Sequence, residues 1–140
     1  MEKKLRREFY ARNADVVARD ILGKVLIRKF PDGTRKEGVI TETEAYLGVK
    51  DLACHAAGGR RTKRTQVMYG NAGFAYIYFV YGMHWLLNVV CSAINDPQAV
   101  LIRGLDVASG PASLTKALEI DGSLNCADMV EKGELWIEDR

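Results

Sequence analysis

Apolar and polar positions in the first third of the chain predict a short helix followed by a β-hairpin. Residues 14–22 have the spacing of a helix, where Asn13 can cap the start and Gly23 can end the last turn. Residues 24–30 and 35–46 predict two strands, because both are largely apolar or alternating and a Pro-Asp-Gly-Thr turn separates them.

A second hairpin is predicted near the middle of the chain. Residues 74–80 and 85–91 are two apolar runs, and the Tyr-Gly-Met-His segment between them predicts the hairpin tip. An Asn-Asp-Pro turn leads into a further strand at residues 99–103. Residues 51–73 lack clean periodicity, so we expect mostly loop there, with one short helix.

The C-terminal pattern completes the expected fold. Pro111 follows Gly110 and predicts a helix over residues 112–119, since proline is favoured at the first helical position. Adjacent hairpins with helices at the ends predict an α+β fold built on a curved, mainly antiparallel sheet with a protruding hairpin. The chain has 140 residues and no repeat or linker, so we expect residues 1–140 to form a single domain.

Composition narrows the class of protein. Hydrophobic residues make up 48% of the chain and charged residues 27%, which is ordinary for a globular protein. No apolar run approaches the roughly 20 residues that span a bilayer. The charged N-terminus is also unlike a signal peptide, so we expect an intracellular protein with no membrane partner. Three cysteines without a C-x-x-C pair predict free thiols, and we expect no metal and no cofactor.

Charge is segregated along the chain, although the formal net charge is only +2. Residues 1–36 carry 11 Lys and Arg against 5 Asp and Glu, and residues 119–140 carry 7 acids against 2 bases. Residues 52–95 contain no acidic residue. A basic surface of this kind suits a polyanionic partner such as nucleic acid, and an ordinary solvated surface is an equal alternative.

The segment Glu-Thr-Glu-Ala-Tyr-Leu-Gly at residues 42–48 contains the first candidate chemistry. On a strand, Glu42, Glu44 and Tyr46 would share one face. Acidic residues are depleted from strands, so this face is either a solvated surface or the place of a general base that activates water.

Tyrosines cluster around the second predicted hairpin. Tyr76 and Tyr78 share one strand face, and Tyr81 lies at the tip. Such rings usually pack across strands, and this segment alone favours packing. A flat ring can also stack on a nucleobase, and a bulky side chain at a tip can wedge into a base stack.

Taken together, these segments resemble the alkyladenine (3-methyladenine) DNA glycosylase family. The resemblance runs in order through residues 42–48, 54–60, 76–83, 88 and 100–103 and a later Gly-Pro-x-x-Leu helix, and it covers residues 9–120. Relatives carry a longer segment where this chain has only residues 104–109, and they continue beyond the equivalent of Glu138. We therefore expect a compact member of the family or one that is shortened at the C-terminus.

The resemblance implies roles for individual residues around a base-binding pocket. Glu44 would be the general base that deprotonates the attacking water, and Arg103 would help to hold that water and the nearby phosphate. Tyr46, His55 and Tyr78 would line the pocket and sandwich a flipped base.

The same resemblance implies contacts with the rest of the substrate. Asn88 would lie at the pocket floor and disfavour the 2-amino group of guanine. Tyr81 would be the wedge that fills the gap in the duplex, with Met83 beside it against the DNA. Arg60 and Arg64 are expected to contact phosphates on the strength of their charge rather than of a motif.

The implied activity is a metal-free, monofunctional base-excision-repair glycosylase that acts as a monomer on double-stranded DNA. Its substrates would be damaged purines (3-methyladenine, 7-methylguanine, hypoxanthine and ethenoadenine), and its product an abasic site. No lysine stands at the matched pocket positions, so we expect no strand cleavage through a Schiff base. Two alternatives are a catalytically inactive binder of damaged or distorted DNA, which an intact Glu44 disfavours, and an unrelated RNA-binding α+β module.

Overall fold

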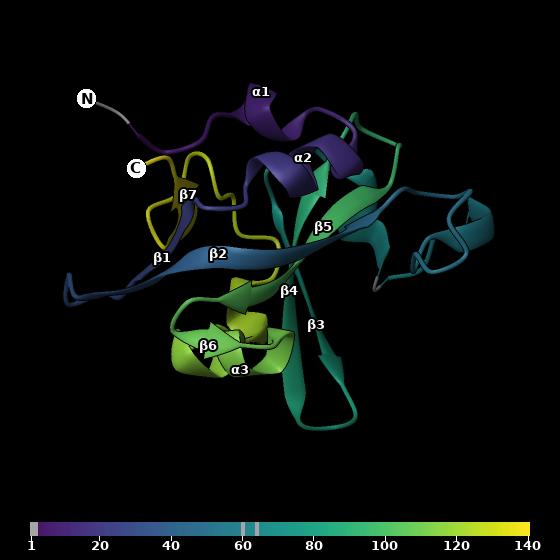
Figure 1. Ribbon diagram of the computed structural model, residues 1–140. Coiled ribbons are helices and arrows are strands. Elements are labelled where there is room, and N and C mark those ends of the chain that lie inside the picture. The colour runs from purple at the N-terminus through teal and green to yellow at the C-terminus, as the bar shows by residue number, and fades with distance from the viewer. Residues whose placement is uncertain (1–2, 60, 64) are drawn as a thin grey trace.

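A curved antiparallel sheet forms the centre of the computed structural model, which describes residues 3–59, 61–63 and 65–140 (Figure 1). Its strands are β1 (Val25–Lys29), β2 (Arg35–Tyr46), β3 (Ala75–Val80), β4 (His84–Cys91), β5 (Gln98–Leu105), β6 (Ala108–Ser109) and β7 (Leu135–Glu138). They lie in the order β3–β4–β5–β2–β1–β7, with β6 paired to β5, and every pairing is antiparallel. This sheet, with the helices around it, confirms the α+β class.

Both predicted hairpins are confirmed. β1 and β2 pair over their shared length, and β3 and β4 pair from Ala75↔Val89 to Val80↔His84. The β3–β4 hairpin projects from the body of the molecule beside the last α-helix (Figure 1). The short segment at residues 104–109 forms a third hairpin, because β6 folds back onto β5 before the chain enters that helix.

Helices lie at both ends of the chain. The α-helices are α1 (Arg7–Tyr10), α2 (Ala14–Asp20) and α3 (Pro111–Ala117), and the 3₁₀ helices are η1 (Ala57–Gly59), η2 (Thr65–Tyr69) and η3 (Gly122–Leu124). α3 begins at Pro111, just before the predicted range of 112–119, and ends at Ala117, because the φ of +55° at Glu119 does not fit an α-helix. No helix of the described residues is long and apolar enough to cross a membrane.

The start of α2 differs from the sequence-based prediction in its cap. Asn13 occupies the N-cap position, but its side chain makes no capping hydrogen bond. The backbone N–H of Ala14 instead donates to Oε1 of Gln98 at 2.8 Å. A residue of β5 therefore supplies the acceptor that the predicted local cap does not, and this ties α2 to the sheet.

The two faces of the β3–β4 hairpin belong to different hydrophobic clusters. Ile77, Leu87 and Val89 join the main core, to which α2 and α3 contribute. Tyr76 and Tyr78 join a second cluster that also holds Met68, Ala56, Val90, Cys54, Tyr69 and Ala99. Alternation of side chains along each strand produces this division. The main core stabilises the sheet, and the second cluster gathers the aromatic residues of the predicted site.

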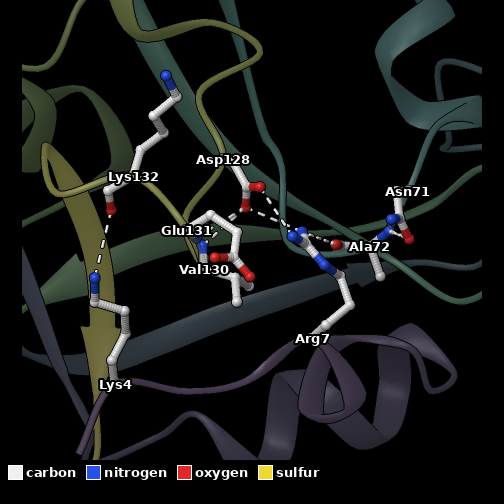
Figure 2. Close-up of polar contacts among 8 residues, drawn as sticks. All are labelled: Lys4, Arg7, Asn71, Ala72, Asp128, Val130, Glu131 and Lys132. Atoms are coloured by element: carbon white, nitrogen blue, oxygen red, sulfur yellow. Dashed lines mark hydrogen bonds and ion pairs between the residues drawn. The ribbon is translucent and has the colours of Figure 1, made fainter. Parts of the chain in front are cut away.

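A partly buried ion pair fastens the N-terminal segment to the loop that precedes β7 (Figure 2). Nη1 and Nη2 of Arg7 donate to the Asp128 carboxylate at 3.0 and 2.8 Å, and Nη1 also donates to the backbone oxygen of Ala72 at 2.9 Å. Burial alone would raise the pKa of Asp128, but hydrogen bonds from Arg7 and from the Val130 and Glu131 amides together lower it. This clamp holds α1 against the entrance to β3.

Candidate active site

A small pocket opens on the face of the hairpin that carries the second cluster. Its lining comes from β2, the following loop, η2, β3 and β4: Tyr46, His55, Met68, Tyr76, Tyr78 and Asn88. The structure thus brings together the residues that the sequence analysis expected to hold a base. The pocket interior measures about 10 Å³, room for about one water molecule. A purine can therefore enter only if side chains of the lining move.

Aromatic rings form the wall of this pocket. The ring centroids of His55 and Tyr78 are 4.5 Å apart at an interplanar angle of 61°, and those of Tyr76 and Tyr78 are 5.2 Å apart at 43°. Nδ1 of His55 lies 2.9 Å from Oη of Tyr76, within hydrogen-bonding distance. This contact attaches the loop at His55 to the rigid strand β3. The aromatic surface is therefore built largely from fixed elements.

Asn88 lines the pocket from β4, where it pairs with Tyr76 of β3. Its side chain is almost fully buried, at 1% exposure, and Nδ2 donates to the backbone oxygen of Tyr76 at 3.3 Å. Asn88 also pairs with Leu101 of β5 in the strand register. A buried amide held in this way presents a fixed polar group to anything that enters the pocket.

Glu44 and Arg103 form an ion pair beside Tyr46, one of the residues that line the pocket. Nη1 of Arg103 donates to Oε2 of Glu44 at 2.9 Å, and the two side chains are 41% and 42% exposed, so water reaches both. Partial burial, followed by hydrogen bonding to the Glu44 carboxylate, raises the pKa of Tyr46. Glu44 thus stands between a cation and a pocket residue, with solvent access.

The register between β2 and β5 breaks where these charged groups lie. Shifts occur on both sides of Glu42, so the alternation expected from Glu42 to Glu44 is interrupted. Gly104 lies opposite Glu42, and a Cβ there would come within 3.0 Å of Oγ1 of Thr41. The glycine therefore permits the irregular crossing, and Glu42 remains exposed while Glu44 and Tyr46 are partly buried.

The tip of the β3–β4 hairpin presents two exposed apolar side chains. Tyr81 is 91% exposed and Met83 is 68% exposed. Tyr81 and Gly82 have φ values of +54° and +68°, and the Met83 N–H donates to the Val80 oxygen at 3.1 Å, as in a type I′ turn. A tyrosine with positive φ is uncommon, so the turn holds this ring outward at a conformational cost.

Comparison with known proteins assigns this arrangement to a family. A family model described as methylpurine-DNA glycosylase matches residues 8–109, which include the pocket, the ion pair and the hairpin tip. The chain belongs to the methylpurine-DNA glycosylase family. A protein of Borrelia garinii subsp. bavariensis named "Putative 3-methyladenine DNA glycosylase" is 44% identical over 145 residues, which cover 94% of this chain and 76% of that one. A Clostridium botulinum strain Hall protein of the same name is 39% identical over 163 residues, which cover 97% and 80%.

Two lining residues of this methylpurine-DNA glycosylase family member were absent from the predicted site. Tyr76 lies two positions before Tyr78 on the same strand face, so the period of the strand could have included it. Met68 comes from the aperiodic segment and carries no sequence signal that places it in a pocket. In the part of the chain that the structure describes, no group of three or more His, Cys, Asp or Glu residues is arranged to hold a metal.

The predicted phosphate contacts Arg60 and Arg64 lie outside the described residues. Arg61, between them, has its guanidinium 4.6 Å from the centroid of the Tyr69 ring, and its Nε donates to Oε1 of Gln66 at 3.0 Å. Tyr69 belongs to the same cluster as the pocket residue Met68. The acid-free segment therefore places a cation close to the pocket of this glycosylase-family protein.

Proposed function

We propose that the protein is a DNA glycosylase of base excision repair, which extrudes damaged purines from duplex DNA and hydrolyses their N-glycosidic bond. The observation that carries the proposal is a partly exposed carboxylate, Glu44, which is ion-paired with Arg103 and hydrogen-bonded to Tyr46 of the aromatic pocket. The substrates would be alkylated or deaminated purines, namely 3-methyladenine, 7-methylguanine, hypoxanthine and ethenoadenine. The protein would act as a monomer and leave an abasic site.

Recognition would depend on opening the pocket. Extruding a base from the stack costs a few kcal/mol, and it costs least for a damaged or mispaired base. Tyr46, His55 and Tyr78 would then hold the base between their rings. An N-alkylated purine is cationic, and each aromatic contact would favour it by roughly 0.5–2 kcal/mol. Asn88, buried and fixed, would disfavour the 2-amino group of ordinary guanine.

Hydrolysis would use the Glu44 carboxylate as a general base. Glu44 takes a proton from water as the water oxygen bonds to C1′ of the deoxyribose, and the bonding pair of the C1′–N bond leaves with the purine. Positive charge develops on the sugar in this step, and the nearby carboxylate stabilises it. An alkylated purine leaves as a neutral base, whereas a neutral lesion must also receive a proton. Arg103 would orient Glu44 and bind the adjacent DNA phosphate.

The hairpin tip would fill the space that the extruded nucleotide vacates. Tyr81 is the exposed ring at the turn, and Met83 follows it on the same tip. Bulky apolar side chains inserted between base steps unstack them and hold the duplex open. The pocket lining contains no lysine, so the reaction would end at the abasic site without a Schiff-base cleavage of the strand.

Base release from defined duplexes tests this function. Wild-type protein is given duplexes that contain one ethenoadenine or hypoxanthine, and methylated DNA, with and without a chelator. We expect abasic sites in the presence of the chelator, and a rate about 10² to 10⁴ times lower for Glu44→Gln, because an amide cannot accept the proton.

Glu42→Gln is the matched control, because it removes the same charge from the same strand at an exposed position. It should release base at close to the wild-type rate. If wild type binds lesion-bearing duplex but releases no base from any substrate, the protein is a binder of damaged DNA. If it prefers single-stranded RNA to such duplexes, it is an RNA-binding module.

A further inference from the structure

A second cleft lies on the opposite face of the β3–β4 hairpin from the base pocket. It has a volume of about 430 Å³ and runs between the hairpin and α3, with Met83, Trp85, Thr115, Lys116 and Ile120 among its walls. Trp85 packs against the main core, whereas Tyr76 and Tyr78 lie in the pocket cluster. The hairpin therefore separates two recesses, one on each side of its tip.

The walls of this cleft are held in place by the fold. Oγ1 of Thr115 donates to the backbone oxygen of Trp85 at 2.7 Å, which ties α3 to β4. The Trp85 ring lies against Gly122, where a Cβ would come within 2.6 Å of the indole, and its centroid is 4.5 Å from that of Phe79. The cleft is thus preformed, and it is much larger than the base pocket.

Charge and position indicate what the cleft can bind. Lys116 is exposed at its rim, and among the residues that the structure describes no carboxylate forms an ion pair with it. By contrast, Lys36 pairs with Glu119 at 2.8 Å. Met83 belongs both to the cleft and to the exposed tip, so the cleft continues the surface that would enter the duplex.

We propose that this cleft binds the sugar–phosphate backbone of the undamaged strand, with Lys116 paired to a phosphate opposite the lesion. The proposal rests on the proposed function, in which the tip stands between the two strands. If the damaged nucleotide moves into the pocket on one face of the hairpin, the undamaged DNA strand lies beside the opposite face of the hairpin. There Met83 and Trp85 offer apolar surface to the deoxyribose, and Lys116 offers a cation to the phosphate.

The salt dependence of binding measures the contact. Affinity for a duplex with a single ethenoadenine or hypoxanthine is measured with Lys116→Gln and with Lys132→Gln, a matched change on the exposed loop near the N-terminal segment (Figure 2). Lys116→Gln should raise the Kd roughly three- to tenfold at low salt and reduce the slope of log K against log salt by about 0.9. Lys132→Gln should change neither.

Replacing single phosphates with neutral analogues shows which DNA strand carries the phosphate that Lys116 contacts. Methylphosphonates replace, one at a time, the phosphates that flank the base opposite the lesion, and a parallel series replaces those of the damaged strand. One position in the undamaged strand should remove the difference between wild type and Lys116→Gln, and no position in the damaged strand should. If Lys116→Gln binds like wild type, or if its defect persists throughout the undamaged-strand series, the cleft proposal is wrong. If wild type neither prefers the lesion nor releases base, the proposed function fails instead.

Discussion

Strand β2 pairs with β1 along its first half and with β5 along its second, and the two halves differ in regularity. Residues 35–39 pair with β1 in an unbroken register, and β1 pairs with β7 in the same way. Residues 40–46 pair with β5 through register shifts on both sides of Glu42. Glu44, the candidate catalytic residue, lies in the irregular half.

Under the proposed function, this difference divides one strand into a part for support and a part for chemistry. A regular ladder pairs its backbone groups, and the regular half of β2 pairs with β1, whose Leu26 and Ile27 are fully buried, so it contributes mainly to stability. A bulge changes the direction of neighbouring side chains, and here the irregular half carries an ion pair that is about 40% exposed. The regular half should therefore govern folding, and the irregular half should govern base release.

The largest expected effect on stability belongs to β1, the strand that pairs with the regular half of β2. Leu26 of β1 is fully buried and lies between Gly38 and Ile137 in the register. Leu26→Ala should lower the free energy of unfolding by about 2–5 kcal/mol, because it removes buried methyl groups and leaves a cavity. Denaturant titration measures this loss, and Lys29→Ala on the same strand should stay within about 0.5 kcal/mol of wild type.

Leu26→Ala also tests whether the two halves of β2 act independently. Base release per folded molecule should be unchanged in Leu26→Ala, measured at a temperature where the protein remains folded. A large fall in the rate per folded molecule would mean that the two halves of β2 are coupled, and that the site depends on the regular ladder.

An intermediate effect is expected at the Arg7–Asp128 clamp, which supports β3 from outside the sheet. Asp128→Asn should lower the free energy of unfolding by about 1.5–3 kcal/mol, the range for hydrogen bonds to charged groups. The lowered pKa of Asp128 means that this contribution is complete above the ordinary aspartate pKa of about 3.9 and is lost as pH falls through the folded-state value. The difference between wild type and Asp128→Asn should therefore shrink in acid.

Asp139→Asn is the control for the clamp. Asp139 also pairs with a cation, Lys24, at 3.1 Å, but its side chain is 68% exposed. Exposed pairs contribute about 0–1 kcal/mol, so this variant should show little loss and little dependence on pH. Equal losses in the two aspartate variants would contradict a special role for the partly buried clamp.

The local features of the fold could be predicted from the sequence. The bounds of β2, at Arg35 and Tyr46, follow from alternation and a turn that lie close together along the chain, and α3 begins at the predicted proline. The features that depend on contacts between segments far apart in the sequence could not be predicted. The cap of α2 comes from Gln98, and the break in β2 depends on Gly104 of another strand.

The candidate site divides in the same way. The alternation of β3 predicts that Tyr76 and Tyr78 share a face, whereas the register shifts beside Glu42 interrupt the alternation expected from Glu42 to Glu44. The resemblance to a family added His55 and Asn88. Met68 enters the pocket from an aperiodic segment, so its position depends on tertiary packing alone. The small volume of the pocket could not be predicted from the sequence either, because it depends on the packing of rings from separate segments.

The smallest effect, and the sharpest test of the contrast between support and chemistry, is expected at the hairpin tip. Tyr81 has a φ of +54°, which costs a non-glycine residue about 1–2 kcal/mol, whereas glycine adopts it freely. Glycine loses about 0.5–1 kcal/mol more backbone entropy on folding, so Tyr81→Gly should gain only about 0.5–1 kcal/mol in stability. The same variant should bind and process lesion-bearing duplex less well, because it lacks the ring.

Tyr81→Phe separates the two effects, because it keeps both the strained backbone and the ring. It should match wild type in stability and retain base release. If the Tyr81 ring serves function at the expense of stability, Tyr81→Gly should stabilise the fold and weaken the activity, whereas Tyr81→Phe should change neither. If Tyr81→Gly is less stable than wild type, or releases base as fast, the outward tyrosine is a structural residue, and the contrast drawn for β2 does not extend to the hairpin.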